Sequence, residues 1–258
     1  MADWDARTYG AVSHPQFAWG RTVVEGLTVR GDETALDAGC GTGRITRLLA
    51  DRLPRGRVIA VDASAAMVRE AARRLRDRPR VTVRRVDLLQ LRLEAPVDLV
   101  FSTATFHWIA DHDRLFARLF AALVPGGWLV AQCGGHGNLD RALAEVDSVN
   151  ASPPFASHLG GVSRPVFFAD PVATRTRLER AGFTAAEASL RTAPTDIGPP
   201  ADAAAFLRTV VLRTYLPALP VELHERYVQA VAGSLAGADG RVLLDYVRLD
   251  LRARRPGG

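Results

Sequence analysis

The clearest sign of the fold is the segment Thr34-Ala-Leu-Asp-Ala-Gly-Cys-Gly-Thr-Gly-Arg44. An apolar run ends at Asp37, and glycines follow at every second position from Gly39 to Gly43. Apolar residues at helical spacing begin directly after them. A strand, a glycine turn and a helix in this order form the unit that opens a doubly wound α/β sheet.

The three glycines indicate that a ligand approaches the backbone of this turn. Glycine adopts positive φ and leaves main-chain N–H groups accessible, and the start of a helix adds further donors. The spacing excludes two common nucleotide-binding motifs. The dinucleotide fingerprint needs a glycine where Arg44 stands, and a P-loop needs a lysine, which the chain lacks.

The composition is that of a soluble globular protein. The chain has 258 residues, of which 48% are hydrophobic and 24% charged, so it forms one large or two small domains. No apolar run approaches the ~20 residues of a membrane span. Acidic residues stand near the start, where a signal peptide would carry positive charge. We therefore expect a cytoplasmic protein without a membrane partner.

The positive charge of the chain does not by itself indicate a nucleic-acid partner. The formal net charge is +5, and every basic residue apart from the histidines is arginine. The densest arginine cluster, at 69–85, also contains acids such as Glu70 and Asp77 and lacks aromatics that would stack on bases. We expect a solvated face there and no nucleic-acid partner.

Two cysteines, Cys40 and Cys133, are too few for a disulfide framework or a metal cluster. We expect both to be buried, reduced thiols, and we expect no metal site.

Strand and helix patterns alternate after the glycine turn, as a parallel sheet requires. The patterns predict strands at 57–62, 81–86, 97–101, 128–133 and 184–192, and a last, antiparallel strand at 240–250. The fold class is therefore α/β, with a Rossmann-like seven-stranded sheet, mostly parallel, and helices on both faces. The tail 252–258 has nothing to bury, and we expect it to be disordered.

The pattern from Asp37 to Gly43, an acid followed by alternating glycines, resembles motif I of class I S-adenosylmethionine (SAM) methyltransferases. Three further pieces follow in the same order as in that family: Asp62, Asp87 and the segment 97–108. The resemblance implies that SAM is the cofactor and S-adenosylhomocysteine the product.

The family resemblance implies roles for the residues around this turn. Asp62, at the end of the second strand, accepts hydrogen bonds from both ribose hydroxyls. Asp87 accepts the adenine amino group or is a solvated loop acid, and Met67 lies against adenine or in the core. The cofactor-binding candidates are Asp37, Gly39, Gly41, Gly43, Asp62, Ala63, Met67, Asp87, Leu88 and Ser102.

A narrower resemblance, to the trans-aconitate methyltransferase group, covers most of the chain. Its motifs are Trp4-Asp5, Trp108-Ile-Ala-Asp-His-Asp113, Val124-Pro-Gly-Gly-Trp-Leu129, Phe206 to Leu216 and Asp239 to Leu244. That group esterifies carboxylates of small acids. Phe206 replaces an expected tryptophan, Val210-Val211 replaces a glycine-containing pair, and 132–138 differs from the group, so the acceptor stays open.

This resemblance organises the chain as a single domain with three parts. Residues 1–30 form an N-terminal helical cover that closes over the cofactor or only packs on the core, and 31–135 form the SAM-binding core. Residues 136–258 complete the sheet and carry helical lid insertions at 138–170 and 198–238.

The acceptor side offers histidines and arginines. A carboxylate acceptor is already ionised and needs only donors, whereas a phenol or alcohol needs a base. His107 and His136 are the catalytic candidates, because a histidine serves either purpose. The substrate-binding candidates are Trp19, His107, Trp108, His136, Arg208 and Arg213. Arg208 and Arg213 are five apart in a predicted helix, so we expect at most one to face the pocket.

We predict a SAM-dependent methyltransferase that acts on a small-molecule acceptor, most simply by O-methylation of a carboxylic acid. The alternatives are an O-, N- or C-methyltransferase of a specialised metabolite, a nucleic-acid methyltransferase, and a non-catalytic SAM-binding protein. We expect a monomer or homodimer.

Overall fold

The structure is a computed structural model, and it describes residues 4–257. The strands are β1 (Thr34–Ala38), β2 (Arg57–Asp62), β3 (Val81–Arg85), β4 (Val97–Thr103), β5 (Leu123–Gly134), β6 (Thr184–Thr192), β7 (Thr195–Asp196), β8 (Leu243–Leu244) and β9 (Val247–Arg254). The α-helices are α1 (Ala6–Val12), α2 (His14–Glu25), α3 (Arg44–Arg52), α4 (Ala65–Arg74), α5 (His112–Ala122), α6 (Asp140–Asn150), α7 (Ala156–Leu159), α8 (Pro171–Arg180), α9 (Pro200–Phe206) and α10 (Val221–Leu235). Shorter turns of helix are η1 (Leu88–Gln90), η2 (Phe106–Trp108), η3 (Leu207–Val211) and η4 (Leu216–Ala218).

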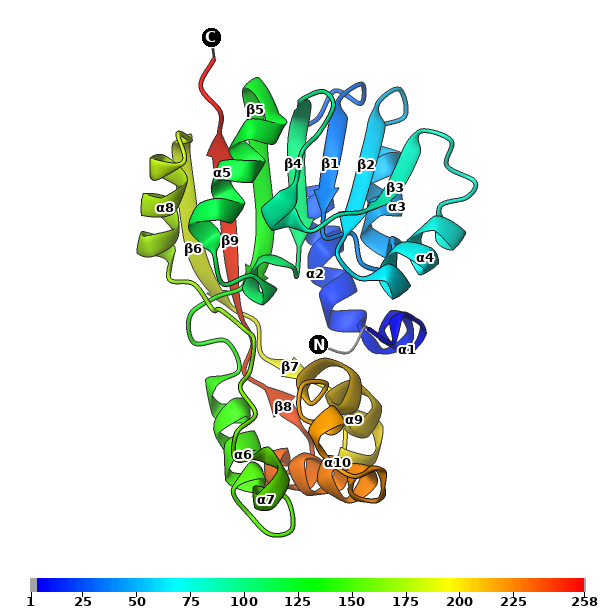
Figure 1. Cartoon of the computed structure of the whole chain (residues 1–258), viewed down its shortest axis with the longest axis vertical. Coiled ribbons are helices and arrows are strands. Elements are labelled where there is room, and N and C mark those ends of the chain that lie inside the picture. The colour runs from blue at the N-terminus through cyan, green and yellow to red at the C-terminus, as the bar shows by residue number, and fades with distance from the viewer. Residues whose placement is uncertain (1–3, 258) are drawn as a thin grey trace. The chain divides into compact units, whose positions relative to one another are not determined.

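Seven strands form one sheet in the order β3-β2-β1-β4-β5-β9-β6 (Figure 1). The pairs β2–β3, β1–β2, β1–β4 and β4–β5 are parallel, whereas β9 runs antiparallel to β5. This arrangement confirms the predicted Rossmann-like sheet, mostly parallel with the last strand antiparallel.

The described chain divides into two compact units. The sheet unit comprises 14–136, 166–191 and 248–257, and the helical unit comprises 4–13, 137–165 and 192–247. The two helices of the predicted N-terminal cover therefore belong to different units, α1 to the helical unit and α2 to the sheet unit. The grouping of both units into a single domain stays a prediction.

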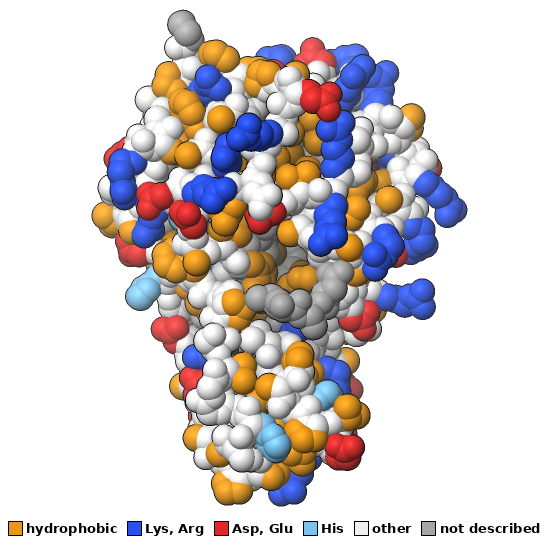
Figure 2. Space-filling model, in the orientation of Figure 1, with side chains coloured by type: hydrophobic (Ala, Val, Ile, Leu, Met, Phe, Trp, Pro, Cys, Tyr) orange, Lys and Arg blue, Asp and Glu red, His pale blue; other side chains and the backbone are white. Residues whose placement is uncertain are grey.

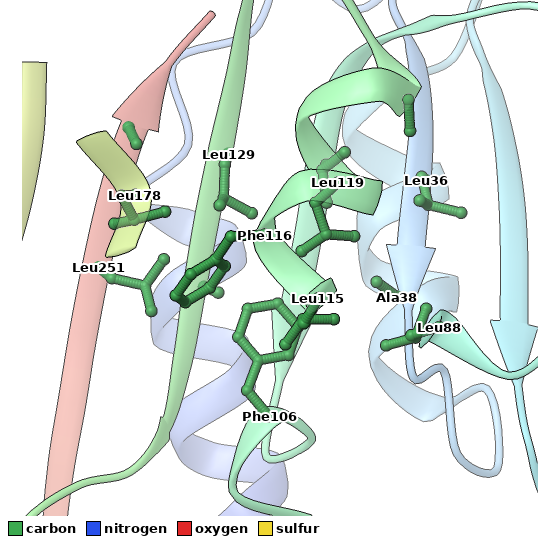
Figure 3. Close-up of a cluster of buried hydrophobic side chains, with 14 of the residues drawn as sticks. Leu36, Ala38, Leu88, Phe106, Leu115, Phe116, Leu119, Leu129, Leu178 and Leu251 are labelled. Carbon is green, nitrogen blue, oxygen red and sulfur yellow. The ribbon is translucent and has the colours of Figure 1, made fainter. Parts of the chain in front are cut away.

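Helices pack on both faces of the sheet, because side chains alternate along each strand and apolar ones point to both faces. On one face, α5 contributes Leu115, Phe116 and Leu119, all fully buried, to a cluster with Leu129 and other strand residues (Figure 3). On the other face, strand residues pack with Val24 of α2 and Leu49 of α3. The predicted covering of both faces is confirmed.

Helix starts follow the local sequence. Asp170 accepts hydrogen bonds from the N–H groups of Val172 and Ala173 at 2.8 and 3.1 Å, and Pro171 occupies the first position of α8, where a missing N–H costs nothing. Ser64 caps α4 by accepting the N–H of Met67 at 3.1 Å. Both capping side chains stand directly before the helix that they cap.

The end of the chain differs from the prediction in two ways. The predicted strand 240–250 is replaced by two strands, β8 and β9, in different sheets. The prediction of a disordered tail at 252–258 is wrong for the residues up to Arg255, because β9 extends to Arg254 and buries Ala253 completely. Gly258 lies outside the described residues. The backbone of Arg255 also bonds both Gly126 and Gly127 of β5, at 3.0 and 2.9 Å, which fixes the tail against the turn before Trp128.

The helical unit is built around α10, which packs on α6 and α9. Tyr227 of α10 is fully buried, and its hydroxyl donates to Asn150 at 2.6 Å. The helix predicted to carry both Arg208 and Arg213 is interrupted by the π-helical turn η3, in which the N–H of Leu212 bonds the carbonyl of Leu207 at 2.8 Å. Within the described residues, no helix combines the length and the apolar character that crossing a membrane requires.

Candidate functional site at the carboxyl ends of the strands

The glycine turn after β1 has one open position. Gly39, Gly41 and Gly43 have φ of +91°, +51° and +78°, a region that glycine adopts without strain. A Cβ at Gly39 would lie 2.2 Å from the Thr105 hydroxyl, and one at Gly43 would lie 3.2 Å from Ala71 of α4. A Cβ at Gly41 would meet nothing within 4 Å, so this is where a ligand can approach the backbone.

Asp62 connects this open position to the next helix. Its carboxylate accepts the N–H of Gly41 and the N–H of Ser64, both at 2.9 Å. The carbonyl of Val61 accepts the N–H groups of Gly39 and Cys40 at 2.8 and 2.9 Å. The end of β2 therefore holds the glycine turn in place and presents a half-buried carboxylate beside Gly41.

Asp37 lies inside the unit, with 1% of its surface exposed. Its carboxylate accepts the hydroxyl of Thr46 in α3 at 2.7 Å. Burial, only partly offset by this hydrogen bond, raises the pKa of Asp37 to about 7. Its visible role is to connect the end of β1 to α3, behind the glycine turn.

The other cofactor candidates divide into exposed and buried residues. Ala63 and Asp87 are exposed, and Asp87 caps η1 by accepting the N–H of Leu89 at 2.9 Å. Met67 and Leu88 are buried. Ser102, also buried, donates to the carbonyl of Ala38 at 2.6 Å and connects β4 to β1. Among these candidates, the side chain of Asp62 contacts the backbone of Gly41 directly.

His107 follows β4 in η2 and has a defined tautomer. Its Nδ1 accepts the N–H of Gly134, at the end of β5, at 3.2 Å. A neutral imidazole that accepts at Nδ1 carries its proton at Nε2. Burial, then the positive charge of Arg248 and the neighbouring His112, lowers the pKa of His107 to about 3. At neutral pH the side chain is a hydrogen-bond donor, which disfavours the interpretation of His107 as a general base.

The other predicted acceptor residues of the sheet unit differ in exposure. The Trp108 ring is half-buried and lies 5.0 Å from the His107 ring, and the Phe168 ring lies 6.0 Å from the His107 ring. His136 is exposed, and its backbone N–H bonds the carbonyl of Ala169 at 3.0 Å. Aromatic rings therefore border His107, whereas His136 points to solvent.

Arg248 was not predicted, although it lies at the same edge. It stands opposite Gly134 in the β5–β9 register, and its guanidinium carbon lies 4.5 Å over the Trp19 ring of α2. Only 3% of its surface is exposed. Arg248 shares the polar face of β9 with Arg252 and Arg254, which are exposed, so the strand pattern carries no signal of its burial.

Arg208 and Arg213 lie in the helical unit. Arg208 pairs with Glu225 at 2.6 Å, and the guanidinium of Arg213 lies 4.0 Å over the ring of Trp4. Arg208 lies within the π-helical turn η3, whereas Arg213 lies in the turn that follows it. The two residues therefore do not share the one continuous helix that the sequence predicted.

Arginines on the surface of the sheet unit are mixed with acids (Figure 2). Arg47 pairs with Asp77 at 2.6 Å, and Arg73 pairs with Glu70 at 2.7 Å. Such pairing reduces the positive potential that a nucleic-acid backbone would require. Among residues 4–257, no group of three or more His, Cys, Asp or Glu side chains is arranged to hold a metal ion.

Comparison with known proteins identifies methyltransferases. A methyltransferase domain family matches residues 35–127. A trans-aconitate 2-methyltransferase from Methylobacterium nodulans is 32% identical over 99% of each chain, and one from an Azoarcus species is 30% identical over 99% of this chain and 100% of its own.

A solved structure shares the fold. It is phosphoethanolamine N-methyltransferase 2 from Haemonchus contortus, in complex with phosphomonomethylethanolamine and S-adenosylhomocysteine, with a TM-score of 0.64 and 20% identity. The match covers 97% of this chain and 57% of that longer chain. At this identity the likeness shows the fold alone.

Proposed function

Because the chain belongs to the class I SAM-dependent methyltransferases, in the group of the trans-aconitate 2-methyltransferases, we propose that it methylates a carboxylate oxygen of a small organic acid. SAM is the cofactor, and when bound it supplies a methyl group activated by a sulfonium centre. The acceptor and its reacting atom are the parts of this statement that need experimental support.

The residues around the glycine turn fit SAM. Gly41 leaves open space where a bulkier residue would place a Cβ, and the Asp62 carboxylate beside it can accept hydrogen bonds from ribose hydroxyls. Buried Met67 follows in the first turn of α4. In this proposal, Gly41 and Asp62 hold the cofactor, and Asp37 and Ser102 position the strands that carry them.

The observation that carries the proposal is the tautomer of His107. A carboxylic acid has a pKa near 4 and a phenol one near 10, so only the phenol needs a base at neutral pH. His107 donates from Nε2 and, with a pKa of about 3, is a very weak base. A buried N–H donor suits an anionic acceptor that it can hold without removing a proton.

The proposal also covers the partners. We propose a small-molecule acceptor rather than nucleic acid, a cytoplasmic location, and a monomer or homodimer. The ion pairs of the surface arginines support the first part, and binding to DNA or RNA that collapses at moderate salt would contradict it.

A transfer assay with methyl-labelled SAM tests the reacting atom. Purified protein is incubated with mono-, di- and tricarboxylic acids and, separately, with phenols and amines. A methyl ester is hydrolysed by mild alkali and releases the label as methanol, whereas N-methyl, C-methyl and aryl ether products keep it. We expect alkali-labile label from carboxylic acids only, and alkali-stable label from a phenol or amine would overturn the proposal.

A further inference from the structure

The strand β6 forms one edge of the seven-stranded sheet. It stands last in the strand order, next to β9, and within residues 4–257 no further strand pairs with it (Figure 1). All of its residues except Ala186 and Ala188 are exposed. The backbone N–H and C=O groups on the open side of such a strand are a template for another strand, so soluble proteins either protect these edges or pair them.

The opposite edge of the sheet carries a protecting device. Its strand, β3, has the sequence Val81-Thr-Val-Arg-Arg85, which contains arginines and no acid. A second copy of β3 would bring like charges together, and this disfavours pairing. In contrast, β6 carries one acid and one base, Glu187 and Arg191, four positions apart.

Glu187 and Arg191 lie on the same face of the sheet, because side chains alternate along a strand. Ala186 and Ala188 pack on the apolar cluster of the other face. Both charged residues are exposed. Arg191 lies 3.6 Å from Asp250 of β9, and both side chains of this pair are more than a third exposed. Such a surface ion pair contributes little, so it leaves Arg191 free to pair with a neighbouring molecule.

Two copies of β6 match each other in one antiparallel register. A two-fold axis perpendicular to the sheet pairs residues that point to the same face, so the axis passes through a residue. With the axis at Ser189, Glu187 of each copy lies opposite Arg191 of the other, which gives two cross-strand pairs of opposite charge. An axis one residue away in either direction pairs neither charge with its opposite.

The backbone of β6 favours the same register. Ala185 has a φ of +48°, which lies outside the extended region, so the regular part of the strand runs from Ala186 to Thr192. Ser189 is the midpoint of this segment. Two copies paired about Ser189 therefore overlap along the whole regular segment. Charge and backbone geometry place the axis at the same residue.

Exposed apolar side chains lie at the same edge. Among the described residues of the sheet unit, the large hydrophobic residues that are exposed are Val172 of α8 and Leu190 of β6. With the axis at Ser189, Leu190 lies opposite Ala188 of the other copy. Pairing would therefore remove apolar surface from water in addition to satisfying backbone groups.

We infer that β6 is a homodimer interface, in which the β6 strands of two copies pair antiparallel about a two-fold axis at Ser189. The partner is a second copy of this chain, because the strand is complementary to itself in charge and in length. Main-chain hydrogen bonds supply affinity, and the charged pairs set the register. The inference goes beyond the proposed function and does not depend on it, since it involves neither the cofactor nor the acceptor.

The first test measures the mass of the full chain in solution. Size-exclusion chromatography with light scattering should show a dimer at about 100 μM chain, where a complex with a micromolar dissociation constant is largely formed. A monomer at this concentration would overturn the inference.

Charge reversal then tests the register. Glu187→Arg brings arginines opposite each other, and Arg191→Glu brings acids opposite each other, so each variant alone should dimerise at least about tenfold more weakly. An equal mixture of the two variants restores both oppositely charged pairs and should form a heterodimer with about the affinity of wild type. Glu179→Arg, the same change at an exposed position of α8, is the control and should leave the dimer intact. A dimer that resists both reversals would contradict the interface.

A cysteine at the axis tests the register without changing any charge. Ser189→Cys places two thiols opposite each other, with Cα atoms about 4.5–5.5 Å apart, a separation that a disulfide spans. Mild oxidation should give a covalent dimer on a non-reducing gel. Glu187→Cys is the control, because its two copies would lie about 13 Å apart along the strands; the native Cys40 and Cys133 are buried. A dimer in which Ser189→Cys does not cross-link would overturn the inference, whatever the transfer assay shows.

Discussion

The two ends of the sheet edge offer opposite chemistry. Beside the glycine turn, the end of β2 presents the half-buried carboxylate of Asp62, whereas Asp37 is buried behind the turn. On the other side, the segment after β4 carries the neutral N–H donor His107, and β9 carries the buried cation Arg248. A carboxylate suits a ligand with hydroxyls and a positive charge, as SAM has, whereas an N–H donor and a cation suit an anion.

This contrast predicts different consequences for substitutions in the two places. Changes at the glycine turn should remove cofactor binding and with it every reaction. Changes at the β4–β5–β9 side should leave the cofactor bound and alter which acceptor is used. Single substitutions on each side, measured for cofactor affinity and for stability, test this separation.

The largest effect is expected from Gly41→Val, which should abolish measurable binding of S-adenosylhomocysteine. The new side chain would enter the space that Gly41 leaves open, and its φ of +51° adds strain. Gly240→Val is the control, because Gly240 has a φ of +73° and equally open surroundings in the helical unit. Both variants should lose about 1–2 kcal/mol of stability, and calorimetric titration should show binding only for the control. Normal binding by Gly41→Val would remove the glycine turn from the site.

Asp62→Ala should weaken binding of S-adenosylhomocysteine roughly 100-fold, because hydrogen bonds to a charged group contribute about 1.5–3 kcal/mol each. Asp170→Ala is the control, since Asp170 also accepts two backbone N–H groups but at the start of α8. Circular dichroism and thermal melting should show that both variants fold. An Asp62 variant with the affinity of the control would contradict the role assigned to the end of β2.

His107→Gln should change how stability depends on pH. The unfolded chain protonates His107 near pH 6.5, whereas the folded protein keeps it neutral to about pH 3. The unfolded state thus binds more protons in this window, and His107 makes the protein less stable as pH falls. Between pH 6.5 and 5 the loss is about 1.5 kcal/mol.

Asp37 has the opposite effect on stability. Its pKa is raised from 3.8 to about 7, so between these pH values the folded state binds more protons than the unfolded state. Asp37 therefore makes the protein more stable as pH falls through this window. The quantity to measure is therefore the difference between wild type and His107→Gln in urea unfolding at several pH values. His136→Gln, at an exposed position, is the control. The same pH dependence in His107→Gln and wild type would show that His107 is not a buried neutral donor.

The smallest effect is expected from Asp87→Ala, about a fivefold loss of affinity for S-adenosylhomocysteine, as for one hydrogen bond to the adenine amino group. Asp87 is exposed and already caps η1. S-inosylhomocysteine, which lacks that amino group, should bind wild type and variant equally. A fivefold loss for both ligands would assign the effect to the cap of η1 instead.

The sheet and its helices could be predicted because their signals are local. Apolar alternation and helical spacing are contained in short windows, and the caps Ser64 and Asp170 stand directly before their helices. The glycine turn that we propose to bind the cofactor could be predicted for the same reason, since the turn, α3 and β2 follow one another directly along the chain.

What could not be predicted depends on packing between distant segments. Arg248 looks like its exposed neighbours Arg252 and Arg254 in sequence, and its different surroundings come from Trp19 and the end of β5. The tautomer of His107 depends on Gly134 in another strand. The ordered end of β9 depends on β5.

The antiparallel strand β9 has a consequence for biosynthesis. Chains emerge from the ribosome N-terminus first, so Gly41 and Asp62 are synthesised long before Arg248. A chain interrupted before β9 carries the complete glycine turn but lacks the buried cation Arg248. The order of translation therefore delivers the glycine turn and Asp62 first and the buried arginine of the sheet unit last.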